Sequence, residues 1–303
     1  MASSVAVASG SSGKVVQSDR WGNVVRYLRR NPTLVVGIIM LFLLLGFWLV
    51  GSVVYDTSKS NPLSVATVQP PSAKLPLGSD RQGRDLLAVM IAGTPLTLRI
   101  GLIAGLLGVG IGTAVAFLAG YYRGPLDTFL KGTVDVGLTI PGLLVLIIVA
   151  VSIRGKGLDV NQMGLIVAIT AWLWPARTIR SQVLTMRERT WVEVARLSGV
   201  GGLEIIFKEM MPNLMPYMLA SLVGSVSSAV LASIGLEALG LGPMSQPTLG
   251  MTIYWVIFYS ALLHGFWWWW APPIAIIVIL FVGLFMLSMG LDELANPRLR
   301  RGV

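Results

Sequence analysis

Apolar residues gather in six runs that contain no charged side chain. A helix that crosses a bilayer needs about 20 mostly apolar residues, and most of the runs reach that length. They cover residues 34–54, 100–119, 136–153, 160–176, 214–236 and 271–291, and the fourth is the shortest and weakest. The pattern predicts an all-α membrane protein with six transmembrane helices.

The polar segments between the runs predict how the chain is organised. The expected parts are an N-terminal tail (1–33), the first transmembrane helix (34–54), a long loop (55–98), a transmembrane domain (99–292) with a charged connection inside it (177–213), and a C-terminal tail (293–303). With both tails in the cytoplasm, sixteen of the 23 lysines and arginines fall on the cytoplasmic side. Because cytoplasmic loops are enriched in these residues, we expect cytoplasmic termini, an even number of crossings and an extracytoplasmic first long loop.

The uncharged stretch 238–291 is long enough to raise the question of a further crossing. Its apolar part 252–263 is too short to span comfortably, and Pro272-Pro273 separates it from the last run. We therefore expect residues 240–270 to form an outer segment with a short helix. Tryptophans are frequent at the membrane–water interface, and Trp267–Trp270 fit such a belt.

The end of the first long loop combines glycines with charged residues. Gly78 and Gly83 suit tight turns, and Asp80, Arg84 and Asp85 are close enough in the chain to pair with one another. A carboxylate is stabilised at the positive N-terminal end of a helix. The sequence therefore predicts a helix that begins near Asp85.

Composition agrees with a membrane protein and argues against several functions. Only 12% of the residues are charged, against about 25% in ordinary soluble domains, and the mean hydropathy is +0.76. The net charge of +9 then reflects orientation in the membrane rather than nucleic-acid binding. With no cysteine, one histidine (His264) and no G-x-x-x-x-G-K-[ST] phosphate loop, we expect no catalytic residue, cofactor or metal in this chain.

The connection 177–213 carries many charges, so it is expected to lie in water. Gly199 is placed to end a helix in the left-handed conformation, and a side chain at this position is expected to obstruct the turn. A second short helix is expected over 203–211, with Pro212 ending it. Two short helices joined by a glycine turn predict a compact projection that fits a socket on a partner protein.

Residues of this connection resemble the EAA loop of ABC import permeases. The matching positions are Glu193-Val-Ala195, Gly199 and Pro212, with valine in the middle of the triplet and methionine before the proline as departures. The resemblance implies that Glu193, Ala195, Arg196, Gly199 and Pro212 couple the permease to ATPase subunits. Glu193 would hold the projection in place by pairing or capping, and Arg196 would pair with an acidic residue of the ATPase.

The resemblance extends over about residues 75–300. Leu77-Gly-Ser-Asp80 followed by Gly83-Arg84-Asp85 is similar to the outer motif of C-type subunits of the dipeptide/oligopeptide permease family. It implies the type I ABC importer (MetI-like) permease fold in a prokaryotic cytoplasmic membrane. The implied partners are a B-type permease subunit, two ABC ATP-binding subunits that hold ATP and Mg²⁺, and an extracytoplasmic substrate-binding protein.

The translocated solute and its path are less defined. Ser221, Ser225 and Ser228 in the fifth run either allow close helix packing or line a polar passage. The resemblance implies peptide transport, with oligosaccharides or nickel chelates as alternatives. Glu237 and Leu249, which differ from the family pattern, bear on the substrate or on docking of the binding protein. A stand-alone secondary transporter or a membrane scaffold remains the alternative from another class, although the six runs lack the intramembrane charges typical of such transporters.

Overall fold

The computed structural model describes residues 28–153 and 157–295, and the regular structure within these ranges is helical. The longer helices are α2 (Pro32–Val54), α3 (Leu86–Tyr122), α4 (Pro125–Thr139), α5 (Gly142–Ile153), α6 (Val160–Ala171), α7 (Leu173–Arg187), α10 (Met211–Ala238), α11 (Leu249–Phe258) and α12 (Trp267–Ala295). The shorter elements are η1 (Thr57–Ser60), α8 (Thr190–Leu197), α9 (Gly202–Glu204) and the π-helical turn η3 (Ile205–Met210). The all-α prediction is confirmed.

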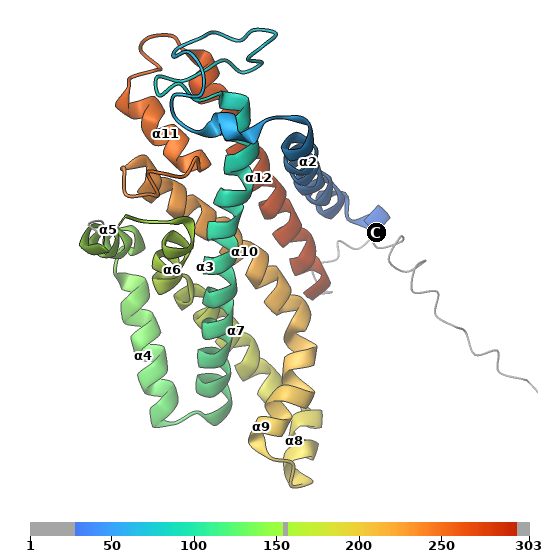
Figure 1. The fold of residues 1–303 in the computed structure, drawn as a ribbon. Coiled ribbons are helices and arrows are strands. Elements are labelled where there is room, and N and C mark those ends of the chain that lie inside the picture. Colours follow the sequence, from blue (N-terminus) through green and yellow to red (C-terminus); the bar gives the residue numbers. More distant parts are fainter. Residues whose placement is uncertain (1–27, 154–156, 296–303) are drawn as a thin grey trace, which may run out of the picture.

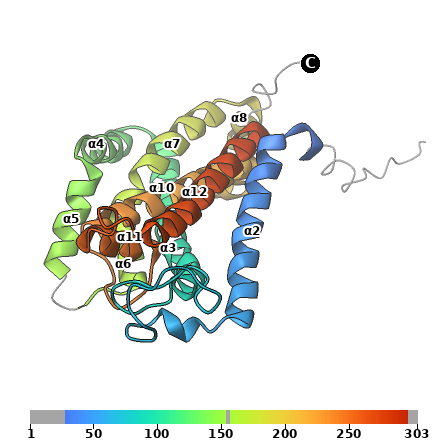
Figure 2. The same ribbon diagram turned by 90° about the horizontal axis from the view of Figure 1, so that it is seen from above.

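Helix α3 forms the axis of the molecule, with α6, α7 and α10 packed around it (Figures 1 and 2). Glycines on α3 allow these neighbours to approach closely. A Cβ added at Gly108 would lie 2.9 Å from backbone atoms of Ala171, and one at Gly105 would lie 2.6 Å from the Val226 side chain. One glycine row therefore faces the junction of α6 and α7, and another faces α10.

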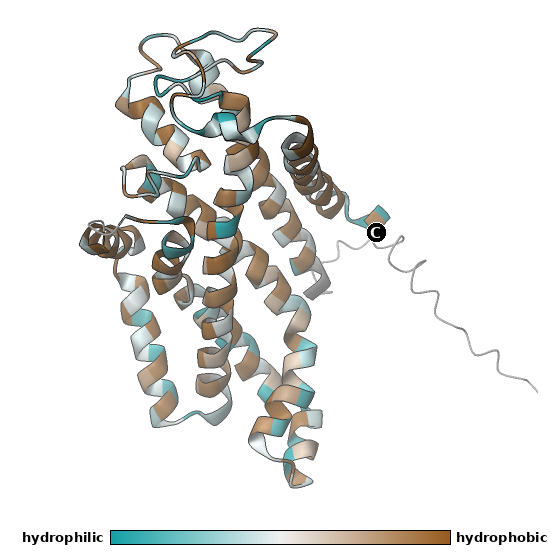
Figure 3. Ribbon diagram, in the orientation of Figure 1, coloured by the Kyte–Doolittle hydropathy of each residue, from teal (hydrophilic) through white to brown (hydrophobic). Residues whose placement is uncertain are grey.

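Helices α2 and α12 lie side by side at the edge of the bundle (Figure 2). A Cβ added at Gly37 would lie 2.7 Å from the backbone nitrogen of Leu287, which shows how closely the two helices approach. The outer surface of α2 exposes large apolar side chains such as Phe42 and Val53. This surface is suited to lipid, and Figure 3 shows the strongly hydrophobic colouring of α2 and α12.

The predicted number of six crossings is not confirmed. Four helices are long and apolar enough to cross a membrane: α2, α3, the continuous helix Gly202–Ala238 and α12. The pair α4 and α5 passes the same test only as one broken span, bent by 83°. The described residues thus offer four spans, or five with the bent pair.

Two of the predicted runs are interrupted by the fold. The run 136–153 is bent at Pro141, because the residue before a proline is driven out of the helical region and Ile140 is extended (φ −75°, ψ 128°). The run 160–176 is divided between α6 and α7 near Trp172. With 12 residues, α6 is about 18 Å long, too short to cross the roughly 30 Å hydrocarbon core alone.

The first long loop ends earlier than its predicted boundary of 98. Helix α3 begins at Leu86, and the Asp85 carboxylate accepts hydrogen bonds from the backbone N–H groups of Leu87 and Ala88. The predicted helix start near Asp85 is therefore confirmed. The remaining loop 55–85 folds over one end of the bundle, beside α11 (Figure 1).

Residues 240–270 contain the expected short helix, α11, at the same end of the molecule as the loop 55–85 (Figure 1). The tryptophan run differs from a simple interfacial belt. Trp267 is 53% exposed, but Trp269 is only 1% exposed and its indole N–H donates to the Ser79 carbonyl at 2.7 Å. The tertiary fold uses Trp269 to join the start of α12 to the loop 55–85.

Candidate coupling surface and translocation cavity

A projection formed by α8, the following turn, α9 and η3 (residues 190–210, here called the knob) lies at one end of the bundle (Figure 1). The loop 55–85 lies at the opposite end of α3, which at 37 residues is about 55 Å long. The knob therefore projects beyond the helices on the side away from α11. This arrangement confirms that the sequence encodes two short helical pieces joined by a glycine-containing turn.

Gly199 occupies the turn after α8 in the left-handed conformation, with φ +79°. Its N–H donates to the Arg196 carbonyl at 3.1 Å, and the N–H of Val200 donates to the Ala195 carbonyl at 3.2 Å. These two bonds are the Schellman pattern, which satisfies carbonyls at a helix C-terminus. The expected steric obstruction is wrong, because a Cβ at Gly199 would meet nothing within 4 Å. Glycine is favoured there by its positive φ rather than by lack of space.

Pro212 does not end the second helix, which is a correction to the prediction. The π-helical turn Ile205–Met210 precedes it, and the Met211 N–H donates to the Ile206 carbonyl, five residues back. A π-helical turn changes the register of the backbone hydrogen bonds, and Pro212 then occupies the first turn of α10, where a missing N–H is tolerated. The knob thus continues directly into a transmembrane helix.

The inner side of the knob is packed against the bundle. Buried apolar side chains from α8 and η3 join those of α3, α7 and α10 in one cluster: Val192, Ile205, Ile206 and Met210 with Phe117, Tyr121, Ile179, Val183 and Leu214. Ala195 packs against the same cluster. The outer side of the knob exposes Val194 (55%), Leu197 (82%) and Leu203 (59%). The knob is therefore anchored on one side and carries apolar surface on the other.

Glu193 and Arg196, the two charged residues of the knob that were predicted to act in coupling, differ in their contacts. Glu193 lies exposed in the first turn of α8, and no cap or ion pair of its side chain is found among the described residues. The role of Glu193 in holding the knob together therefore stays a prediction. The guanidinium of Arg196 lies 5.9 Å from the centre of the Tyr121 ring.

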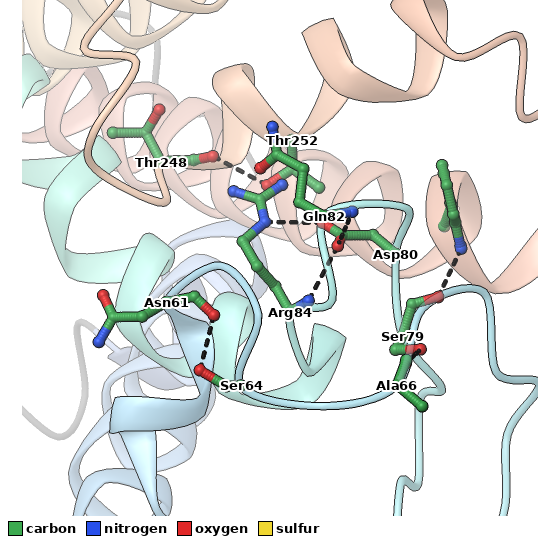
Figure 4. Close-up of polar contacts among 10 residues, drawn as sticks. Asn61, Ser64, Ala66, Ser79, Asp80, Gln82, Arg84, Thr248 and Thr252 are labelled. Carbon is green, nitrogen blue, oxygen red and sulfur yellow. Dashed lines mark hydrogen bonds and ion pairs between the residues drawn. The ribbon is translucent and has the colours of Figure 1, made fainter.

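At the other end of the molecule, the predicted outer motif is a buried polar cluster (Figure 4). Asp80 and Arg84 are 3% and 4% exposed, and Arg84 Nε donates to Asp80 Oδ2 at 2.6 Å. Asp80 Oδ1 also accepts the backbone N–H groups of Gln82 and Arg84. Gly78 and Gly83 have φ values of +68° and +72°. The motif is therefore a closed structural turn, and these contacts show no binding role for it.

Asp85 has a second role besides capping α3. Its Oδ2 accepts a hydrogen bond from the Tyr55 hydroxyl at 2.6 Å, which joins the end of α2 to the start of α3. Burial raises the pKa of the Tyr55 phenol, and the hydrogen bond to the Asp85 carboxylate raises it further. The phenol therefore remains a hydrogen-bond donor at neutral pH.

A cavity of about 340 Å³ lies between α6, α7, α10 and the end of α12. Ser221, Ser225 and Ser228, the three residues singled out as pathway candidates, all line it. Other polar groups from the neighbouring helices also line it: Thr170, Thr178, Tyr217, Ser288 and Asp292. The cavity is therefore rich in hydroxyl groups.

Two charged residues make contacts that the sequence analysis did not predict. Glu237 is completely buried near the end of α10, and its Oε2 accepts the Thr248 hydroxyl at 2.5 Å at the start of α11. Asp292 lines the hydroxyl-rich cavity. Both residues lie just past an apolar run. Their positions in the sequence do not indicate that Glu237 is buried or that Asp292 lines a cavity.

Comparison with known proteins agrees with this architecture. Residues 108–301 match the family described as "Binding-protein-dependent transport system inner membrane component". The chain is 30% identical to a glutathione transport system permease protein, GsiD, of Pectobacterium atrosepticum over 73% of its own length and 72% of the relative's.

Two further relatives are named as peptide permeases. The chain is 29% identical to the dipeptide transport system permease protein DppC of Bacillus subtilis, over 93% of this chain and 86% of the relative. It is 30% identical to the oligopeptide transport system permease protein OppC of Mycobacterium tuberculosis, over 58% of this chain and 60% of the relative. The chain therefore belongs to the family of inner-membrane permease components of binding-protein-dependent ABC transporters, within the group that contains the oligopeptide and dipeptide C-type permeases.

Proposed function

We propose that this chain forms half of the translocation path of an ATP-driven importer for di- and oligopeptides. Family membership supports the permease role. The relatives described above are named for glutathione, dipeptide or oligopeptide transport, and all three solutes are peptides. The proposed assembly contains a B-type permease, an extracytoplasmic binding protein and two ATP-binding subunits that hold ATP and Mg²⁺.

The observation that carries the coupling mechanism is the two-sided construction of the knob. One side is packed into the same apolar cluster as α3, α7 and α10, and the other exposes Val194, Leu197 and Leu203. Exposed apolar side chains on an otherwise charged surface are typical of a site that a partner protein binds. Movement of an attached ATPase subunit would then displace these helices together, as alternating access requires of an element with two discrete positions.

The hydroxyl-rich cavity is the proposed part of the translocation path within this subunit. Ser221, Ser225 and Ser228 present uncharged hydrogen-bonding groups, and Asp292 is the one carboxyl group among the lining residues. Such a lining suits peptides with varied side chains, because transport requires that binding along the path remain weak. For the topology, we retain six crossings with cytoplasmic termini, which places the knob on the side of the ATPase subunits.

Substitutions at Gly199 test the coupling role. Valine is strongly disfavoured at positive φ, whereas asparagine adopts the left-handed conformation more readily. In liposomes that contain the complete transporter, we expect Gly199→Val to lower uptake of a labelled dipeptide at least about ten-fold, an effect of about 1.4 kcal/mol or more. Gly199→Asn should retain most of the uptake.

Quantification of the inserted permease in each preparation separates coupling from assembly. Transport by Gly199→Val at the wild-type rate would reject the coupling role of the knob. The same liposomes test the solute: uptake of an oligosaccharide or a nickel chelate in place of dipeptides would reject the peptide assignment.

A further inference from the structure

The hydroxyl-rich cavity is bordered by one face of α10. The residues of this face are spaced by three or four positions, as on one side of a helix: Ser221, Gly224, Ser225 and Ser228. The hydroxyl groups of the three serines make no hydrogen bond with another described residue. Helical serines elsewhere, such as Ser198, donate to the carbonyl four residues earlier. The cavity therefore contains hydroxyl groups that are available to a solute.

Asp292 is the carboxyl group of this cavity, and α12 brings it there. One turn earlier on α12, the Ser288 hydroxyl donates to the Ala220 carbonyl at 3.3 Å. A Cβ added at Gly224 would lie 3.5 Å from the Ser288 hydroxyl oxygen, so α10 and α12 are close at this level. Asp292 lies four residues beyond Ser288, which is about 6 Å further along the helix. Because α12 runs away from the loop 55–85, Asp292 borders the cavity on the side nearer to the knob.

No cation among the described residues neutralises Asp292. Its side chain is exposed and forms no ion pair or hydrogen bond with another described residue. The other residues that line the cavity are uncharged. The cavity is open to the surface of this chain, since Trp174 (64% exposed) and the exposed Ser228 line it. A positively charged solute in the cavity would therefore meet one carboxylate and no opposing charge from the lining residues.

We propose that Asp292 makes this cavity a weak subsite for cations, so that the importer favours peptides with a net positive charge over anionic peptides. This inference rests on the proposed function, since it requires that the cavity carries the solute. The attraction between two single charges across a hydrated gap is modest. It adds a preference while binding along the path stays weak, as transport requires.

The lining suits the ammonium or guanidinium group of a peptide better than a metal ion. Within the described ranges, no group of three His, Cys, Asp or Glu side chains could hold a metal. Ammonium and guanidinium groups donate hydrogen bonds, and serine hydroxyl groups and a carboxylate accept them. The cavity volume of about 340 Å³ also falls within the range of sites for small organic ligands, about 300–1,000 Å³.

Thiol chemistry measures the charge of the cavity without any assumption about the transported solute. Ser221→Cys places a thiol in the cavity of a chain that has no other cysteine. In the purified complete transporter, a cationic and an anionic thiosulfonate reagent modify this thiol, and their rates are compared. We expect Asp292→Asn to lower the cationic-to-anionic ratio about four-fold, because a single charge about 10 Å away through water changes the two rates about two-fold in opposite directions.

Asp135→Asn is the matched control for this measurement. Asp135 lines a separate cavity between α3, α4 and α7, and the substitution removes the same charge. The ratio in this control should stay close to that of Ser221→Cys alone. An equal change in both variants, or an unchanged ratio in Asp292→Asn, would overturn the inference. Failure of both reagents to modify the thiol at position 221 would also overturn it, because a solute could not then reach the cavity.

Uptake into liposomes tests the consequence for transport. A lysine-containing and a glutamate-containing dipeptide are supplied at equal concentrations with the same binding protein, whose own preference cancels when variants are compared. We expect Asp292→Asn to lower the lysine-to-glutamate uptake ratio about two- to four-fold, and Asp135→Asn to leave this ratio unchanged. Equal ratios in wild type and Asp292→Asn would contradict a role of the carboxylate in selectivity.

Failure of this inference and failure of the proposed function give different results. If the wild-type transporter imports dipeptides and the uptake ratio does not respond to Asp292→Asn, the selectivity inference alone is rejected. If the wild-type transporter imports no dipeptide of either charge, the peptide assignment itself is rejected. The thiol-modification ratio reports the charge of the cavity in both cases.

Discussion

Asp80 and Arg84 are charged and almost completely buried, and they pair within one tight turn through Arg84 Nε, while Arg84 Nη2 is buried without a partner among the described residues (Figure 4). A buried ion pair is costly to form, but removal of one partner leaves an uncompensated charge. Their proximity in sequence made a pairing within this group predictable. The contact between Asp85 and Tyr55 was not predicted, because the two residues are 30 positions apart and only the fold brings them together.

Loss of Arg84 should therefore destabilise the loop 55–85. We expect Arg84→Met to lower the free energy of unfolding by about 3 kcal/mol, at the lower end for a broken buried ion pair. The loss is limited because the Asp80 carboxylate still accepts two backbone N–H groups. Thermal unfolding in detergent provides the measurement. Arg81→Met is the control, since Arg81 is exposed. Equal melting temperatures of the two variants would contradict the structural role assigned to the motif.

At the scale of helices, prolines and glycines decide the details that apolar patterns leave open. Pro141 separates α4 from α5 at an angle of 83°, whereas Pro212 is accommodated after a π-helical turn and ends nothing. The two prolines differ in the backbone before them, which is extended at Ile140 and π-helical over Ile205–Met210. Glycines likewise matter where a neighbouring helix approaches closely, as at Gly37, or where φ is positive, as at Gly199.

Helix α2 offers a comparison between two glycines on one element. A Cβ at Gly37 would lie 2.7 Å from the Leu287 nitrogen and 2.8 Å from the Gly283 oxygen on α12, whereas Gly46 has nothing within 4 Å. Gly37→Val should push α2 away from α12 and lower the free energy of unfolding by about 1–3 kcal/mol, the usual effect of overpacking. Gly46→Val should melt close to wild type. A drop of similar size in both variants would show that valine acts through something other than this helix contact.

At the scale of the whole molecule, the knob and the loop 55–85 lie at opposite ends of the long helix α3 (Figure 1). The apolar outer surfaces of α2 and α12 lie between these ends (Figure 3). This geometry supports the proposal that the two ends lie on opposite sides of a membrane. The positively charged connection 177–213 favours the cytoplasm for the knob.

The natural absence of cysteine makes this assignment directly testable. We expect a membrane-impermeant maleimide to label Ser72→Cys in intact cells and not Ser198→Cys, since both positions are exposed but lie at opposite ends. Labelling should reverse in inside-out vesicles. Labelling of both variants from the same side would contradict the proposed topology.

The sequence by itself determined the helical class, the membrane environment, the family motifs and the left-handed position of Gly199, because each depends on local composition or on short spacing. The tertiary structure alone decided that Trp269 and Glu237 are buried and that Arg187 meets Tyr121. Those features depend on contacts between residues distant in the chain. Apolar periodicity carries no record of such contacts, because a lipid-facing and a protein-facing helix surface have similar hydrophobicity.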